Sequence, residues 1–162
     1  MPRDFMTTAL NASHWWRRGA SGRGVRIAIF DTGLNAQHSF VSNVVEIVNF
    51  TGEESSEDIV GHSTFMTGTV ASRDTEGCPG LAPNAEVTIV RVFDSTQTST
   101  TAWFLDGFNF ALHRRFDIIN LAVGGPDFRD DAFASKVRRA AHPREPSLDP
   151  LRGGIDRSRT SL

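Results

Sequence analysis

The apolar positions of this sequence fall into four short runs, separated by longer polar and amphipathic segments. The runs cover residues 25–30, 44–50, 86–93 and 117–123. The first is almost continuously apolar and rich in β-branched side chains, which is typical of a strand buried on both faces of a sheet. The other three resemble it in length and composition, so the pattern predicts four strands.

Three further segments have the spacing of helices. Residues 62–72 combine apolar side chains at helical intervals with small residues that permit close packing against a sheet. Residues 102–115 give the clearest helical pattern. The apolar side expected for this helix consists of Trp103, Leu105, Phe108, Ala111 and Leu112. A last helix is predicted from residue 130 to about residue 141.

Strands that alternate with helices in this way are joined by right-handed crossovers and form a parallel sheet. The predicted fold class is therefore α/β, with a doubly wound parallel sheet. Residues 1–24 are expected to form an N-terminal arm and residues 25–137 the folded domain. Residues 138–162 are rich in proline and arginine and have no apolar periodicity, so a disordered tail is predicted there.

An acidic residue, Asp31, follows the first predicted strand directly. Ligands and chemistry are found at the carboxyl ends of strands in open parallel sheets, so Asp31 is placed to act there. An acid in this place can orient the imidazole of a histidine such as His62, which begins a predicted helix, and that histidine can then serve as a general base. Both residues have a simpler interpretation: Asp31 as a turn or helix cap, and His62 as a cap or solvated residue.

The composition excludes several other classes of function. A net charge of −2 provides no basic face for nucleic acid. The single cysteine, Cys78, rules out a disulfide framework and a cysteine-rich metal site, and no glycine-rich phosphate loop is present. We therefore expect no metal and no cofactor. No stretch approaches the length and apolarity of a membrane span, and the N-terminus lacks the apolar core of a signal peptide.

Four segments, in this order, resemble motifs of the subtilisin-like serine peptidases, the S8 family. They are residues 27–34 around Asp31, residues 58–68 around His62, the loop 80–85, and the strand 120–125. The resemblance extends from about Ala9 to Phe133. It implies a subtilisin-like fold and serine endopeptidase activity, with Asp31 orienting His62 and His62 as the general base.

The resemblance also implies a partner, namely a peptide or protein substrate in an extended conformation. The substrate would pair by strand addition with a short segment of the last predicted strand. This segment consists of Leu121, Ala122, Val123, Gly124 and Gly125. Residues 90–93, 103–109 and 124–128 resemble one branch of the family, which implies a location in the secretory pathway and cleavage of membrane-anchored precursors.

Two departures from the family pattern bear on activity. Ser63 replaces the family's glycine after the histidine, where a side chain could crowd the imidazole. The family's nucleophile, in a Gly-Thr-Ser motif, and its oxyanion asparagine do not occur in these 162 residues. We therefore expect the N-terminal portion of a catalytic domain, truncated and inactive by itself. The alternatives are a non-catalytic fragment that binds peptide or propeptide, and an unstable remnant.

The Asp-Thr-Gly sequence at residues 31–33 is also the signature of aspartic peptidases. Their chemistry requires two such carboxylates in an all-β fold. The helices predicted at residues 62–72 and 102–115 argue against that interpretation.

Overall fold

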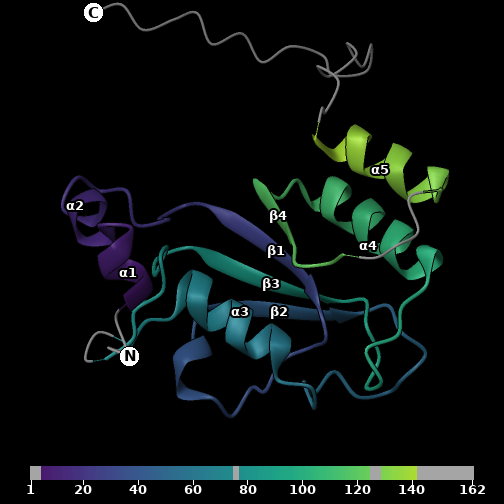
Figure 1. Ribbon diagram of the computed structural model, residues 1–162, viewed down its shortest axis with the longest axis horizontal. Coiled ribbons are helices and arrows are strands. Elements are labelled where there is room, and N and C mark those ends of the chain that lie inside the picture. Colours follow the sequence, from purple (N-terminus) through teal and green to yellow (C-terminus); the bar gives the residue numbers. More distant parts are fainter. Residues whose placement is uncertain (1–4, 75–76, 125–128, 142–162) are drawn as a thin grey trace, which may run out of the picture.

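The computed structural model describes residues 5–74, 77–124 and 129–141. A four-stranded parallel sheet lies at its centre (Figure 1), with the strand order β2-β3-β1-β4. The strands are β1 (Arg26–Asp31), β2 (Val44–Asn49), β3 (Glu86–Arg91) and β4 (Ile118–Leu121). All four predicted strands are thus present, and the α/β fold class is confirmed.

Five helices and one 3-10 turn complete the described part of the chain. They are α1 (Phe5–Ala9), α2 (Ala12–Trp16), η1 (Ser39–Val41), α3 (His62–Ala71), α4 (Thr101–Arg114) and α5 (Asp131–Ala141). Helix α3 covers one face of the sheet, whereas α4 and α5 lie on the other (Figure 1). The sheet is therefore doubly wound, as its apolar runs predicted.

The central strand β1 explains why both faces must be covered. Side chains alternate between the two faces of a strand, and Ile27 and Ile29 enter the core beneath α3. Ala28 and Phe30 enter the other core, beneath α4. Because all four side chains are fully or almost fully buried, β1 has no polar face. A nearly continuous apolar run is the sequence signature of such a strand.

The fourth strand is shorter than the sequence predicted. Residues 117–123 were expected to be extended, but β4 covers only Ile118–Leu121. Asp117 lies before the strand, and one of its carboxylate oxygens accepts a hydrogen bond from the backbone N–H of Arg26. Beyond Leu121, Ala122 and Val123 are exposed.

Helix α4 was predicted correctly, but its buried stripe is displaced from the expected one. The buried residues are Phe104, Gly107, Phe108 and Ala111, with i, i+3, i+4, i+7 spacing. Trp103 and Leu105, which were expected on this side, are only partly buried. Gly107 lets the helix approach the sheet closely, since a Cβ atom there would lie 2.8 Å from a ring carbon of Phe30.

Helix α3 packs on the sheet through its small and polar residues. Its buried side chains are Ser63, Thr64, Thr67 and Ala71, whereas Phe65 is 70% exposed. Small side chains bring the helix close to β1, as the sequence suggested. Of the apolar residues in the helical pattern, Val70 packs against this core, whereas Phe65 points to solvent.

An arm was predicted at the N-terminal end of the chain, residues 1–24, and a tail at its C-terminal end, residues 138–162. The predicted arm contains the short helices α1 and α2, and the Trp16 side chain donates a hydrogen bond to the carbonyl oxygen of Leu81 at 2.9 Å. The last predicted helix, from residue 130 to about residue 141, is present as α5 and ends at Ala141, so the first residues of the predicted tail, 138–141, are helical. The rest of the predicted tail, residues 142–162, lies outside the described residues.

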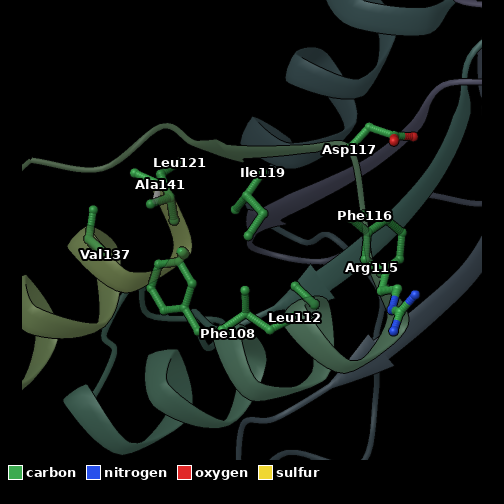
Figure 2. Close-up of a pocket in the computed structure, with 11 residues that line it drawn as sticks. Phe108, Leu112, Arg115, Phe116, Asp117, Ile119, Leu121, Val137 and Ala141 are labelled. Atoms are coloured by element: carbon green, nitrogen blue, oxygen red, sulfur yellow. The ribbon is translucent and has the colours of Figure 1, made fainter. Parts of the chain in front are cut away.

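An apolar groove of about 820 Å³ runs between α4, α5 and β4. Figure 2 shows that its side chains converge from all three elements, with Phe108 and Leu112 on α4, Ile119 and Leu121 on β4, and Val137 on α5. Strand β4 is an edge of the sheet among the described residues. None of the described helices is both long and apolar enough to cross a lipid bilayer.

Candidate active site

Asp31 is the last residue of β1, and its carboxylate is buried at the carboxyl end of the sheet. The backbone N–H of Thr32 donates a 2.7 Å hydrogen bond to Oδ1. The chain then turns at Gly33, whose φ of 118° favours glycine. A Cβ atom at Gly33 would lie 2.4 Å from the carbonyl oxygen of Ser56, so the turn also requires glycine for space.

His62 is the first residue of α3 and follows Gly61, which has a φ of 84°. Its Nδ1 atom lies 2.9 Å from Oδ1 and 2.8 Å from Oδ2 of Asp31. A carboxylate can only accept hydrogen bonds, so this contact places the imidazole proton on Nδ1 and leaves the lone pair on Nε2. The acid is 3% exposed and the imidazole 46% exposed, so the pair has one buried and one accessible member.

A second buried carboxylate, Asp58, lies between the two elements that carry Asp31 and His62. Its Oδ1 atom accepts hydrogen bonds from the Thr32 hydroxyl at 2.6 Å and from the Gly61 N–H at 2.8 Å. Its Oδ2 atom accepts 2.7 Å hydrogen bonds from the N–H and the hydroxyl of Thr64. Burial raises the pKa of Asp58, but these hydrogen bonds outweigh it and hold the pKa below the ordinary value.

Two threonine hydroxyls extend this network. The Thr32 hydroxyl, which donates to Asp58, also accepts the backbone N–H of Ser63 at 3.3 Å. The Thr64 hydroxyl accepts the backbone N–H of Asn35 at 3.0 Å. The end of β1, the loop after it and the start of α3 are thereby joined through side chains.

Ser63, the departure from the family glycine, is fully buried. Its hydroxyl has no hydrogen-bond partner among the described residues. The imidazole of His62 nevertheless reaches Asp31 at 2.8 Å. The serine side chain is therefore accommodated without displacing the imidazole from the acid.

Arg91, which is 1% exposed at the end of β3, was not singled out from the sequence. It pairs in register with Asp31 in the neighbouring strand. Its guanidinium donates to the carboxylate of Glu53 and to the carbonyl oxygens of Ser55 and Phe93. A charged residue inside an apolar strand pattern is the signal that could have identified it, because such a charge is buried only when it is paired.

The predicted substrate segment begins one strand away from Asp31. Leu121 ends β4 and pairs in register with Phe30, the residue before Asp31. Ala122, Val123 and Gly124 follow the strand and are exposed, and Gly125 lies outside the described residues. Within residues 5–74, 77–124 and 129–141, no three His, Cys, Asp or Glu side chains gather as metal ligands would.

A buried acid at a strand end, hydrogen-bonded to a histidine at a helix start, is an arrangement of serine peptidases. Residues 22–147 match the Subtilase family, and the chain belongs to that family. The family expected from the motifs is thereby confirmed.

Several relatives are proteases. The chain is 46% identical over 137 residues to the membrane-bound transcription factor site-1 protease of Homo sapiens, covering 85% of this chain and 13% of the relative. It is 42% identical over 132 residues to subtilisin-like protease SBT6.1 of Arabidopsis thaliana, covering 82% and 13%. With the major intracellular serine protease of Bacillus subtilis (strain 168), it shares 33% identity over 125 residues, covering 72% and 39%. The chain thus spans about an eighth of the length of the membrane-bound transcription factor site-1 proteases that it matches, called the site-1 relatives below.

Proposed function

We propose that this chain carries the acid and the base of a Ser-His-Asp triad in a subtilisin-type serine endopeptidase. The observation that carries the proposal is the contact of the His62 Nδ1 atom with both oxygens of the buried Asp31 carboxylate. Asp31 holds the imidazole in the Nδ1–H tautomer and stabilises the imidazolium that forms. Nε2 takes the proton of the attacking hydroxyl and later gives it to the leaving amine.

The nucleophile is proposed to come from outside these 162 residues, which contain no Gly-Thr-Ser motif. Ser63 is unsuited to the role because its hydroxyl is fully buried and because neighbouring residues on a helix point in different directions. In a subtilisin, removal of the serine alone lowers turnover about a millionfold. The 162 residues by themselves are therefore proposed to lack peptidase activity.

The proposed substrate is a protein segment in an extended conformation, which would add as a strand beside Leu121, Ala122, Val123, Gly124 and Gly125. In support, Leu121 lies at the edge of the described sheet, one strand away from the one that ends in Asp31. By analogy with the site-1 relatives, we propose membrane-anchored protein substrates and a secretory-pathway location.

The experiment has two arms. The 162-residue chain is first assayed with a peptide substrate, and no hydrolysis above the buffer rate is expected. In the second arm, residues 22–147 of this chain replace the matching segment in the human relative, and the resulting chimaera is called the exchanged enzyme. The exchanged enzyme is expected to cleave the peptide, and His62→Ala is expected to abolish cleavage. The proposal is contradicted if the exchanged enzyme folds but does not cleave. It is also contradicted if the 162-residue chain hydrolyses the peptide and this activity persists in His62→Ala.

The second candidate function, peptide binding without cleavage, is favoured by the lack of a nucleophile motif together with the exposed residues 122–124. It predicts that the short chain binds an extended peptide that remains intact. A binding measurement with mass analysis of the recovered peptide separates the two candidates.

A further inference from the structure

We propose that Asp58 is a positioning residue that fixes His62 against Asp31 by clamping the end of β1 to the start of α3. The inference rests on the proposed function, because it gives Asp58 a purpose in the same site. Asp58 touches neither reacting atom; it acts through the residues on both sides of His62.

The clamp has one contact at the residue after β1 and three at the start of α3, counting Gly61, which precedes the helix. The Thr32 hydroxyl, next to Asp31, donates to Oδ1 of Asp58. The N–H of Gly61 and both the N–H and the hydroxyl of Thr64 donate from the start of α3. His62 lies between Gly61 and Thr64 in the sequence, so the backbone on both sides of the imidazole is held by one carboxylate.

The site requires an ionised carboxylate rather than any polar side chain. Four donors converge on Asp58, and only a carboxylate provides two oxygens with enough lone pairs for all of them. The start of a helix carries a partial positive charge and unpaired N–H groups, which a buried negative charge satisfies. Asparagine has the same shape but replaces one oxygen with an NH₂ group that would face donors.

Among the described residues, Asp58 and the Thr32 hydroxyl are the side chains that accept N–H groups at the start of α3. Gly61, at the position before the helix, has no side chain that could cap it. The N–H of Ser63, the residue after His62, donates to the Thr32 hydroxyl, which itself donates to Asp58. Loss of the carboxylate therefore loosens the Gly61, Ser63 and Thr64 contacts together, while Asp31 remains fixed in β1.

The distance between Asp31 and His62 is the quantity that Asp58 is proposed to set. A contact of 2.8 Å does not survive a displacement of the imidazole by about 1 Å, and such a misplacement in an active site lowers the rate by about 100-fold. In the exchanged enzyme, Asp58→Asn is therefore expected to lower kcat by about 100-fold and to leave KM within about twofold.

The decisive measurement is made on the 162-residue chain and needs no hydrolysis. In a chain labelled with ¹⁵N-histidine, the Nδ1–H proton that is hydrogen-bonded to Asp31 gives a downfield imidazole resonance, which is assigned by its loss in His62→Gln. We expect Asp58→Asn to remove this resonance. Thr32→Val, which removes both the donor to Asp58 and the acceptor of the Ser63 N–H, is expected to shift or broaden it.

Asp130→Asn is the matched control. Asp130 also accepts a backbone N–H at a helix start, from Phe133, and a threonine hydroxyl, from Thr101, but it serves α5. This variant is expected to keep the His62 resonance at its wild-type position. A general effect of removing a carboxylate that caps a helix would appear in both variants, whereas a positioning effect appears only in Asp58→Asn.

The outcomes separate the two proposals. If the resonance is absent from the wild-type chain, or is unchanged in a folded Asp58→Asn variant, the positioning role is wrong. If Asp58→Asn fails to fold, the Thr32→Val spectrum decides, and an unchanged resonance there overturns the role. An inactive exchanged enzyme in which the resonance still depends on Asp58 overturns the proposed function and leaves the positioning inference intact.

Discussion

The Nδ1 atom of His62 lies within hydrogen-bonding distance of both carboxylate oxygens of Asp31, although the two residues come from different elements. Asp31 ends a buried strand, and His62 begins a helix that is packed on the same sheet. The carboxyl edge of a parallel sheet brings such ends together, so the fold itself supplies the pair. The acid needs only to be buried and ionised to hold the imidazole in one tautomer.

Asp31→Asn tests that role directly. An amide can donate to Nδ1 and so favours the wrong tautomer, with the proton on Nε2. In the exchanged enzyme we expect kcat to fall by about four orders of magnitude, as such a replacement does in serine peptidases of another fold. Asp106→Asn, an exposed change on α4, serves as the control and is expected to retain activity. A decrease of less than about tenfold would argue against a triad.

Asp58 should make stability depend on pH at the acidic end. Its pKa in the folded protein is lower than the ordinary 3.8, because its hydrogen bonds outweigh the effect of burial. The stability that it contributes is therefore complete above the ordinary value and is lost as the pH falls through the lower folded value. The difference in unfolding free energy between the wild type and Asp58→Asn should shrink over that window in urea titrations.

A non-titrating comparison checks this interpretation. The difference between wild type and Ser63→Ala should not vary with pH, since neither side chain gains a proton. If the difference in unfolding free energy between the wild type and Asp58→Asn is also constant between about pH 5 and pH 2, the depressed pKa of Asp58 makes no contribution to stability.

Ser63→Ala should stabilise the chain. The Ser63 hydroxyl is fully buried without a partner among the described residues, and an unsatisfied buried polar group costs about 1–3 kcal/mol. Alanine also has the higher helix propensity, so an increase of about 1 kcal/mol in the unfolding free energy is expected. Ser13→Ala, at an exposed position of α2, should change it by less than about 0.5 kcal/mol. Destabilisation by Ser63→Ala would show that the hydroxyl has a partner.

Two glycine-to-alanine changes should have opposite signs. At Gly107 the new Cβ would lie 2.8 Å from Phe30 and 3.0 Å from Val90, and both neighbours are fully buried. Overpacking of this kind costs about 1–3 kcal/mol. At Gly68 in α3 the new Cβ would meet nothing within 4 Å, so the gain in helix propensity of about 0.5–1 kcal/mol should remain. Chemical denaturation measures both, and equal signs would contradict the close approach of α4.

The sequence predicted the fold well because burial on both faces leaves a clear signature. The run from Val25 to Phe30, apolar except for Arg26, is typical of a strand covered on both faces, and the structure covers both. Helix faces were harder to predict, since Phe65 contributes to an apolar pattern but is exposed, while the polar Thr67 is buried. Hydropathy cannot show that small size, rather than apolarity, brings α3 close to the sheet.

The site was predictable only in part, for a related reason. Asp31 and His62 stand at the boundaries of elements, which a sequence pattern marks, and the structure places them in contact. The roles of Asp58 and Arg91 also depend on partners that are distant in the sequence. Asp58 receives a hydrogen bond from Thr32, and Arg91 reaches Ser55, across 26 and 36 positions respectively. No local pattern encodes such a pairing.

Arg91→Lys should show that the guanidinium fork is required as well as its charge. Three groups accept hydrogen bonds from Arg91: the Glu53 carboxylate and the carbonyl oxygens of Ser55 and Phe93. A lysine ammonium keeps the charge but cannot span this geometry, and hydrogen bonds involving a charged group contribute about 1.5–3 kcal/mol. We expect the unfolding free energy to fall by about that amount and residues 53–57 to become more susceptible to proteolysis, because Arg91 anchors this loop beside Gly33.

Arg73→Lys, which removes one hydrogen bond from an exposed side chain to the carbonyl oxygen of Pro83, should cost less than about 0.5 kcal/mol. If the two replacements had equal effects, the charge of Arg91 alone would account for its contribution, and the loop would not depend on the fork.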